Sequence, residues 1–132
     1  MLHSPLWLTY WNSLVDYAEI GDFICVHGWI PTVDKSGMPL SPSEWNNNYA
    51  SWRKAAWENC FRNWRANHIP YGKTIVCGHW RTYDANEYYH NKAGHQAFVD
   101  EGIIALDGTS AAKDGCVNCV VIENNEVIYV SD

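Results

Sequence analysis

The stretch Asp22-Phe23-Ile24-Cys25-Val26-His27-Gly28 is a short apolar run that stops at a histidine and a glycine. Two further runs have the same form. Ile75-Val76-Cys77 stops at Gly78-His79, and Ile103-Ile104-Ala105-Leu106 stops at Asp107-Gly108. Short runs that are rich in β-branched residues and are closed by a turn signal are typical of buried strands. We therefore predict three strands, at residues 22–27, 73–77 and 102–107.

The segments around these runs predict the remaining elements. Residues 5–19 and 44–66 carry apolar side chains at three- and four-residue spacing, which predicts two helices. Residues 31–43 and 80–100 are irregular and predict loops. Two β-rich runs, 117–122 and 126–130, flank the turn Glu123-Asn124-Asn125 and predict a hairpin. This order of elements indicates an α/β or α+β sheet rather than a helix bundle.

Composition and charge narrow the class of protein. The chain has 132 residues, which suggests one domain over residues 1–132. Its net charge of −6 argues against non-specific nucleic-acid binding, although a bound metal could still attract a phosphate. We see no run approaching the ~18 apolar residues of a membrane span and no signal peptide. Five cysteines, an odd number, indicate a reducing, cytoplasmic compartment.

Polar side chains at the three strand ends form the candidate site. Ligands bind beyond the carboxyl ends of strands in open α/β sheets, so His27, His79 and Asp107 are placed to converge there. Two histidines and an aspartate at one edge suggest a metal or acid–base site. The other interpretation is that each residue makes only local hydrogen bonds. His90 and His95, within 80–100, could line the same site from the loop.

The cysteines allow alternative sites. Cys25 and His27, together with Cys77 and His79, could form a structural zinc site, but straight strands hold residues two apart about 6.5 Å from each other. Buried core is the more favoured role for both cysteines. Cys116-x-x-Cys119 is a single pair without a second pair to complete a site. The tryptophans of 44–66 suit a core or an interface better than a ligand platform.

Together the three motifs resemble the calcineurin-like metallophosphoesterases. Phe23-Ile24-Cys25-Val26-His27-Gly28-Trp29 is similar to their VHGG strand, and Val76-Cys77-Gly78-His79-Trp80 to their GH motif. Ile104-Ala105-Leu106-Asp107-Gly108, followed by residues 117–122, is similar to their closing strands. The order and spacing agree over residues 20–130, and the branch that the chain most resembles contains serine/threonine protein phosphatases and bis-nucleotide hydrolases.

The resemblance implies a partial two-sheet sandwich with flanking helices and a site for two divalent metal ions, commonly Mn, Fe, Zn or Ni. It implies that His27 and His79 bind metal and that Asp107 orients a histidine. Some members carry GHxH, and Arg81 stands here where the second histidine would be. Arg81 would then hold a substrate phosphate, or be an ordinary exposed arginine.

The family's D-x-H, G-D-x-x-D and G-N-H-[ED] motifs are not in this sequence. The chain therefore resembles only the C-terminal half of a phosphatase, and we expect little activity from it without a separately encoded N-terminal half. The substrate would be a protein or nucleotide phosphoester. The alternatives are a degenerate, non-catalytic interaction module and, less favoured, the structural zinc module.

Overall fold

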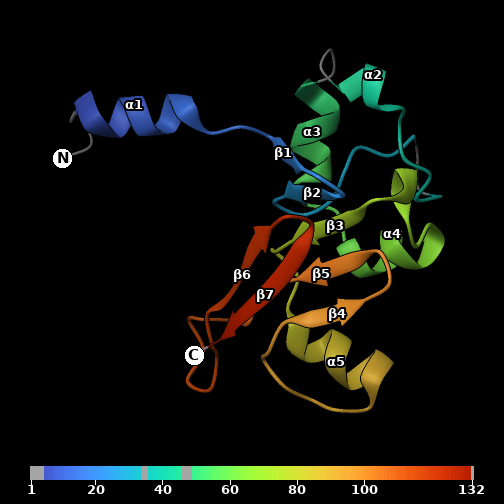
Figure 1. Ribbon diagram of the computed structural model, residues 1–132, viewed down its shortest axis with the longest axis vertical. Helices are drawn as coiled ribbons and strands as arrows, with labels where there is room; N and C mark the ends of the chain where they lie inside the picture. Colours follow the sequence, from blue (N-terminus) through green and yellow to red (C-terminus); the bar gives the residue numbers. More distant parts are fainter. Residues whose placement is uncertain (1–4, 34–35, 46–48, 132) are drawn as a thin grey trace.

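The computed structural model describes residues 5–33, 36–45 and 49–131 (Figure 1). It has an α/β fold made of a five-stranded mixed sheet, a two-stranded hairpin and several helices. The helices are α1 (Pro5–Ser13), α2 (Pro42–Trp45), α3 (Tyr49–Ala55), α4 (Cys60–Ala66), the 3-10 turn η1 (Pro70–Gly72) and α5 (Thr82–His90). The strands are β1 (Tyr17–Ile20), β2 (Phe23–Val26), β3 (Thr74–Cys77), β4 (Phe98–Asp100), β5 (Ile103–Ala105), β6 (Asn118–Glu123) and β7 (Glu126–Ser131).

The three apolar runs form the parallel centre of the sheet, as predicted. The strand order is β1-β2-β3-β5-β4, in which β2, β3 and β5 run parallel and the two edge strands run antiparallel to their neighbours. Because parallel strands point the same way, the carboxyl ends of β2, β3 and β5 lie at one edge. The predicted hairpin is also confirmed, with β6 paired antiparallel to β7.

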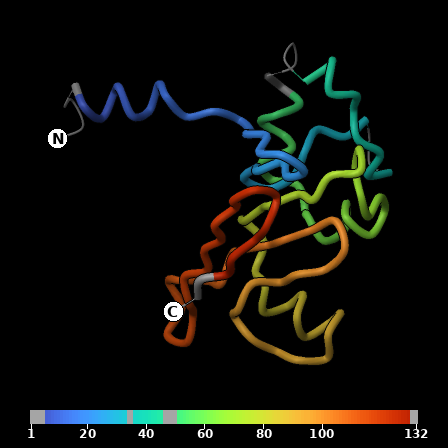
Figure 2. The backbone as a smooth tube through the Cα atoms, in the orientation of Figure 1, coloured from blue at the N-terminus to red at the C-terminus, as the bar shows by residue number. Residues whose placement is uncertain are grey.

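Each face of the sheet packs against a different set of elements. The face that carries Ile24, Ile75 and Ile103 packs against a core of tryptophans and phenylalanines from the helices and the segment after β2. The opposite face, with Phe23, Val76 and Ile104, packs against the hairpin. Alternate side chains along a strand point to opposite faces, so strands covered on both faces read as continuous apolar runs. Figure 2 shows the hairpin, at the red end of the chain, beside the sheet and on the side away from α3 and α4.

The predicted helix at 5–19 is shorter in the structure, because it stops at Ser13 and a strand follows. That strand, β1, pairs with β2 across a tight turn in which Gly21 has φ +56°, a value that glycine adopts without strain. Tyr17 stacks on Trp52 at 5.0 Å and meets Trp45 edge-on at 5.2 Å. Tertiary packing of this tyrosine thus overrides the helical spacing of the local sequence.

The predicted helix at 44–66 is interrupted. Residues 46–48 of that prediction lie outside the described residues, as do 34–35 of the predicted loop 31–43. A turn separates α3 from α4, and the Asn59 side chain caps α4 by accepting from the Arg62 N–H at 3.0 Å. The loop predicted at 80–100 is also wrong in part, because it contains α5 and β4.

The helix α1 projects away from the rest of the molecule (Figures 1 and 2). Its described side chains are all exposed, and they include large apolar ones at Leu6, Leu8 and Trp11. Such a helix leaves a large apolar area in water, which marks an interaction surface. Among the described residues, no helix combines the length and apolarity needed to cross a bilayer.

We expect the exposed face of α1 to drive self-association of the isolated chain. In sedimentation velocity, the sedimentation coefficient should rise with protein concentration. The double variant Leu8→Glu, Trp11→Glu should stay monomeric, since the charges oppose burial of that face. Tyr88→Glu, on the exposed surface of α5, is the matched control and should associate like the parent. A sharply melting monomer at high concentration would contradict this expectation.

Candidate functional site

His27 and His79 lie side by side at the carboxyl edge of the sheet. Their rings are 4.9 Å apart between centroids. The β2–β3 ladder continues beyond both strands, because the Gly78 N–H donates to the His27 carbonyl at 2.8 Å. His27 is exposed and His79 is half-buried, so both imidazoles are accessible to a ligand. The prediction that these two strand ends converge is confirmed.

The backbone of His79 has a left-handed conformation, with φ +65°. Cys77 faces the helices and Cys25 faces the hairpin, so simple alternation would put His79 on the opposite face from His27. The left-handed residue breaks this alternation, and its ring meets that of His27 instead. Positive φ is uncommon outside glycine, and residues held there gather at functional sites.

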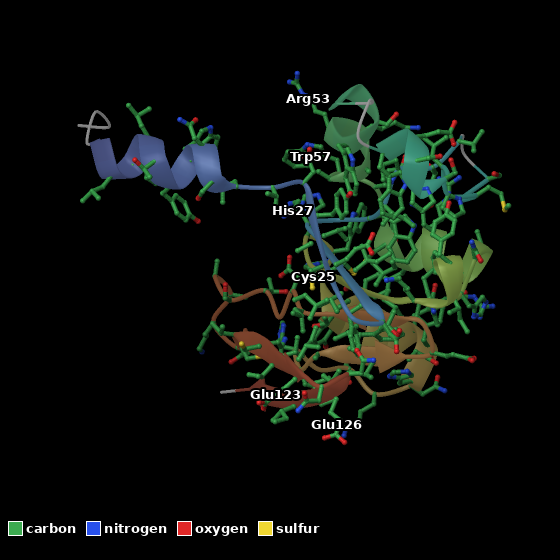
Figure 3. The ribbon with its side chains drawn as sticks, turned by 45° about the horizontal axis from the view of Figure 1, so that its top comes forward. Cys25, His27, Arg53, Trp57, Glu123 and Glu126 are labelled. Atoms are coloured by element: carbon green, nitrogen blue, oxygen red, sulfur yellow. The ribbon has the colours of Figure 1, made fainter. Side chains whose placement is uncertain are left out.

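Trp57 completes the cluster, although its place among the tryptophans of 44–66 predicts a core or interface role. Its ring meets His79 edge-on at 4.8 Å and 88°, and His27 at 6.4 Å and 73°. The spacing of 44–66 predicts a continuous helix here, but Trp57 lies in the turn between α3 and α4. The signal that would have found it is Asn59, a strong helix-capping residue two positions later. Figure 3 shows Trp57 beside His27.

Gly28 allows the turn that carries Trp57 to approach the strand end. A Cβ atom on Gly28 would lie 2.4 Å from the Ala56 carbonyl oxygen, which is too close for any side chain. The neighbouring Trp29 N–H donates to the Ala55 carbonyl at 3.0 Å. The glycine that closes the first strand run is therefore needed for close backbone packing against the end of α3.

The Asp107 side chain forms its hydrogen bond within the turn that follows β5. Its carboxylate accepts from the Thr109 N–H at 2.9 Å, and its carbonyl accepts from the Thr82 N–H at 2.9 Å and from the Thr82 hydroxyl at 3.1 Å. In the part of the chain that the structure describes, its side-chain hydrogen bond is thus to a backbone amide and not to an imidazole. Asp107 fixes the start of α5 and does not join the histidine pair there.

Arg81 stands at the N-cap of α5 and pairs with Asp84. Its NH2 nitrogen lies 2.7 Å and its Nε 2.9 Å from one carboxylate oxygen of Asp84. Both side chains are more than half exposed, so water screens the pair and it contributes little stability. A phosphate could therefore replace the carboxylate as partner of the guanidinium at small cost.

The other two candidate histidines, His90 at the end of α5 and His95 in the segment after it, contact their own surroundings. His90 stacks on Phe98 at 4.6 Å and 7°, and its Nε2 lies 3.5 Å from an Asp100 carboxylate oxygen. His95 lies against Tyr83 at 4.9 Å. Its Nδ1 is buried and has no hydrogen-bond partner among the described residues.

The register between β2 and β3 argues against a zinc site that uses both Cys25 and Cys77. The pairing of Cys25 with Val76 puts Cys77 one position further along, so the two thiols face opposite sides of the sheet. Burial raises the pKa of the Cys25 thiol. A hydrogen bond to Cys60, together with burial, raises that of Cys77. Neither thiol therefore favours the thiolate form that binds zinc.

The histidine pair can supply part of a metal centre. Neutral imidazole is a good ligand for Mn, Fe, Zn and Ni ions, and two accessible rings lie together here. Within residues 5–33, 36–45 and 49–131, no group of three or more histidine, cysteine or acidic side chains is placed to hold an ion.

Comparison of the chain with protein-family models, with curated proteins and with solved structures finds no match.

Substitution of Gly28 tests the close approach of the Trp57 turn. Gly28→Ala should lower the free energy of unfolding by about 1–3 kcal/mol, because the methyl group forces backbone apart. Gly78→Ala is the matched control, since its Cβ would meet only the His27 carbonyl oxygen at 3.6 Å, an ordinary contact. Urea denaturation measures both, and equal effects would contradict the packing described here.

The cost of the left-handed backbone at His79 can be measured separately from the contribution of its imidazole ring. His79→Gly and His79→Ala both remove the imidazole, but only glycine relieves the left-handed backbone. We expect the glycine variant to be more stable than the alanine variant by about 1 kcal/mol. Paired thermal and urea unfolding would check this. An alanine variant as stable as the glycine one would show that the positive φ carries no cost.

Proposed function

We propose that this chain contributes part of the active centre of a metal-dependent phosphoester hydrolase, with His27 and His79 as metal ligands. The observation that carries the proposal is the contact of these two imidazoles, 4.9 Å apart, at the ends of adjacent parallel strands. The left-handed backbone of His79 supports it, because this conformation brings the second ring to the first.

A divalent ion, when bound, supplies polarisation of the phosphoryl group and activation of water. The chain's own residues have simpler roles. The two imidazoles donate nitrogen lone pairs, and Arg81 exchanges its exposed Asp84 partner for a substrate phosphate. Asp107 acts as a positioning residue, because its carbonyl holds the first turn of α5 through Thr82.

The remaining ligands would come from a second polypeptide segment, the N-terminal half that the family resemblance implies. A cavity of about 450 Å³ between the sheet and the hairpin supports this, since it reaches His27 and Gly78 and is lined mainly by apolar side chains. We infer that this cavity and the exposed face of α1 receive that segment, and that the hairpin belongs to the second layer of a metallophosphoesterase sandwich. The protein would work in the cytoplasm, because the reducing conditions there suit five free cysteines.

A non-catalytic interaction module is the second candidate, and the exposed apolar face of α1 favours it. The two proposals differ in what lies upstream. Translation of the DNA before Met1 in all frames should show D-x-H, G-D-x-x-D and G-N-H if the chain is part of an enzyme. Their absence would favour the interaction module.

Metal binding tests the role of the histidines. We expect Zn²⁺ or Ni²⁺ to bind the isolated chain weakly, because two imidazoles make an incomplete set of ligands. Binding measured by calorimetry should disappear in the double variant His27→Ala, His79→Ala. It should persist in His68→Ala, a control that removes an exposed histidine elsewhere. Binding that survives the double substitution would exclude the pair as ligands.

Hydrolysis of a phosphoester tests whether the metal centre of the isolated chain is incomplete. With added Mn²⁺, the isolated chain should hydrolyse p-nitrophenyl phosphate little or not at all, since water activation needs further ligands. Addition of a segment that carries the missing motifs should restore a chelator-sensitive rate. Robust, chelator-sensitive hydrolysis by the chain alone would show that the centre is already complete.

A further inference from the structure

We propose that Trp57 is a stacking platform for a planar aromatic group of the substrate, which makes the substrate an aromatic phosphoester. This inference rests on the proposed function for the phosphate, but the platform itself needs no metal. The observation behind it is a tryptophan that is 67% exposed while its ring contacts both histidines. A single exposed apolar side chain needs no explanation, but one fixed against a pair of candidate ligands does.

Most of the indole surface is open to solvent, because Trp57 is 67% exposed. The two imidazoles meet the indole at 88° and 73°, so neither is stacked parallel to it. Trp57 itself does not line the cavity of about 350 Å³ beside His27, so the platform rests on the exposed indole and its ring contacts. In the view of Figure 3, Trp57 lies between His27 and Arg53. An aromatic ring on Trp57 would therefore lie next to a phosphate held at the histidines.

The turn that presents Trp57 is held from both sides. Before it, the Ala55 carbonyl accepts from the Trp29 N–H at 3.0 Å. After it, the Glu58 carboxylate accepts from the Thr32 hydroxyl at 3.1 Å and from the Asn63 amide at 2.7 Å. A backbone fixed in this way leaves little conformational freedom to lose when a ligand stacks on the ring.

Other tryptophans fit this role less well. Trp80 also meets His79 edge-on, at 6.2 Å, but it is less exposed, at 38%. Among the ring contacts of the described residues, Trp57 is the tryptophan that reaches both imidazoles. Tyr88, on the outer surface of α5, has an exposure of 78% and offers a control aromatic residue outside the proposed binding surfaces.

The experiment measures the affinity of four probes by calorimetry, with and without Zn²⁺. Adenosine carries a ring without phosphate, ribose 5-phosphate carries phosphate without an aromatic ring, and adenosine 5′-phosphate and phenyl phosphate carry both. We expect Trp57→Ala to weaken binding of the ring-bearing probes about 5- to 150-fold, the range for loss of one base–aromatic stack. Ribose 5-phosphate should be unaffected. Trp57→Phe should retain most of the affinity, and Tyr88→Ala all of it.

Each outcome distinguishes this inference from the proposed function. If adenosine binds through Trp57 while no metal binds at the histidines, the platform stands and the hydrolase proposal fails. If metal binds but Trp57→Ala changes no affinity, or if Tyr88→Ala changes it equally, the platform is excluded. Ring-bearing probes that bind no better than ribose 5-phosphate would exclude it too. A preference between adenosine 5′-phosphate and phenyl phosphate then identifies the aromatic group as a nucleobase or a simple aryl ring.

Discussion

The register between β2 and β3 is the constraint on which the candidate site depends. Pairing of Cys25 with Val76 aligns the two strands so that the Gly78 N–H donates to the His27 carbonyl. This ladder puts both histidines at one edge of the sheet. A shift of one residue would turn every side chain of β3 to the other face, which would disrupt the packing of Ile75 and Val76 and separate the imidazoles. The core that fixes this register therefore also positions the site.

Much of this arrangement could be predicted from the sequence, because the signals are local and strong. Continuous apolar runs that end at glycine predict the three central strands, and β-rich runs around Asn124-Asn125 predict the hairpin; the structure confirms both. Parallel strands predict that His27 and His79 lie at one edge, but the contact of their rings also needs the left-handed backbone of His79, which the sequence does not reveal. The resemblance to metallophosphoesterases, the metals and the substrate stay predictions, to be tested by the experiments above.

Other features depend on contacts between residues far apart in the sequence. The strand β1 forms because Tyr17 packs on Trp45 and Trp52, which helical spacing alone cannot reveal. Asn59 is a local signal for the break between α3 and α4, but the close packing of this turn against Gly28 and the contact of Trp57 with the histidines join residues far apart in the sequence. The role expected for Asp107 depended on side-chain direction, which the position of a residue after a strand does not determine.

The pairing of β1 has a consequence for how a partner would reach the histidines. Tyr17 lies opposite Val26, the residue before His27, so the short link from α1 enters the sheet at the end where the site lies. A partner that holds α1 is thereby tethered near the histidine edge. Its second contact becomes intramolecular, with an effective concentration on the order of millimolar for a short link. Two individually weak contacts, one on the helix and one at the strand ends, would then act together as a bivalent attachment.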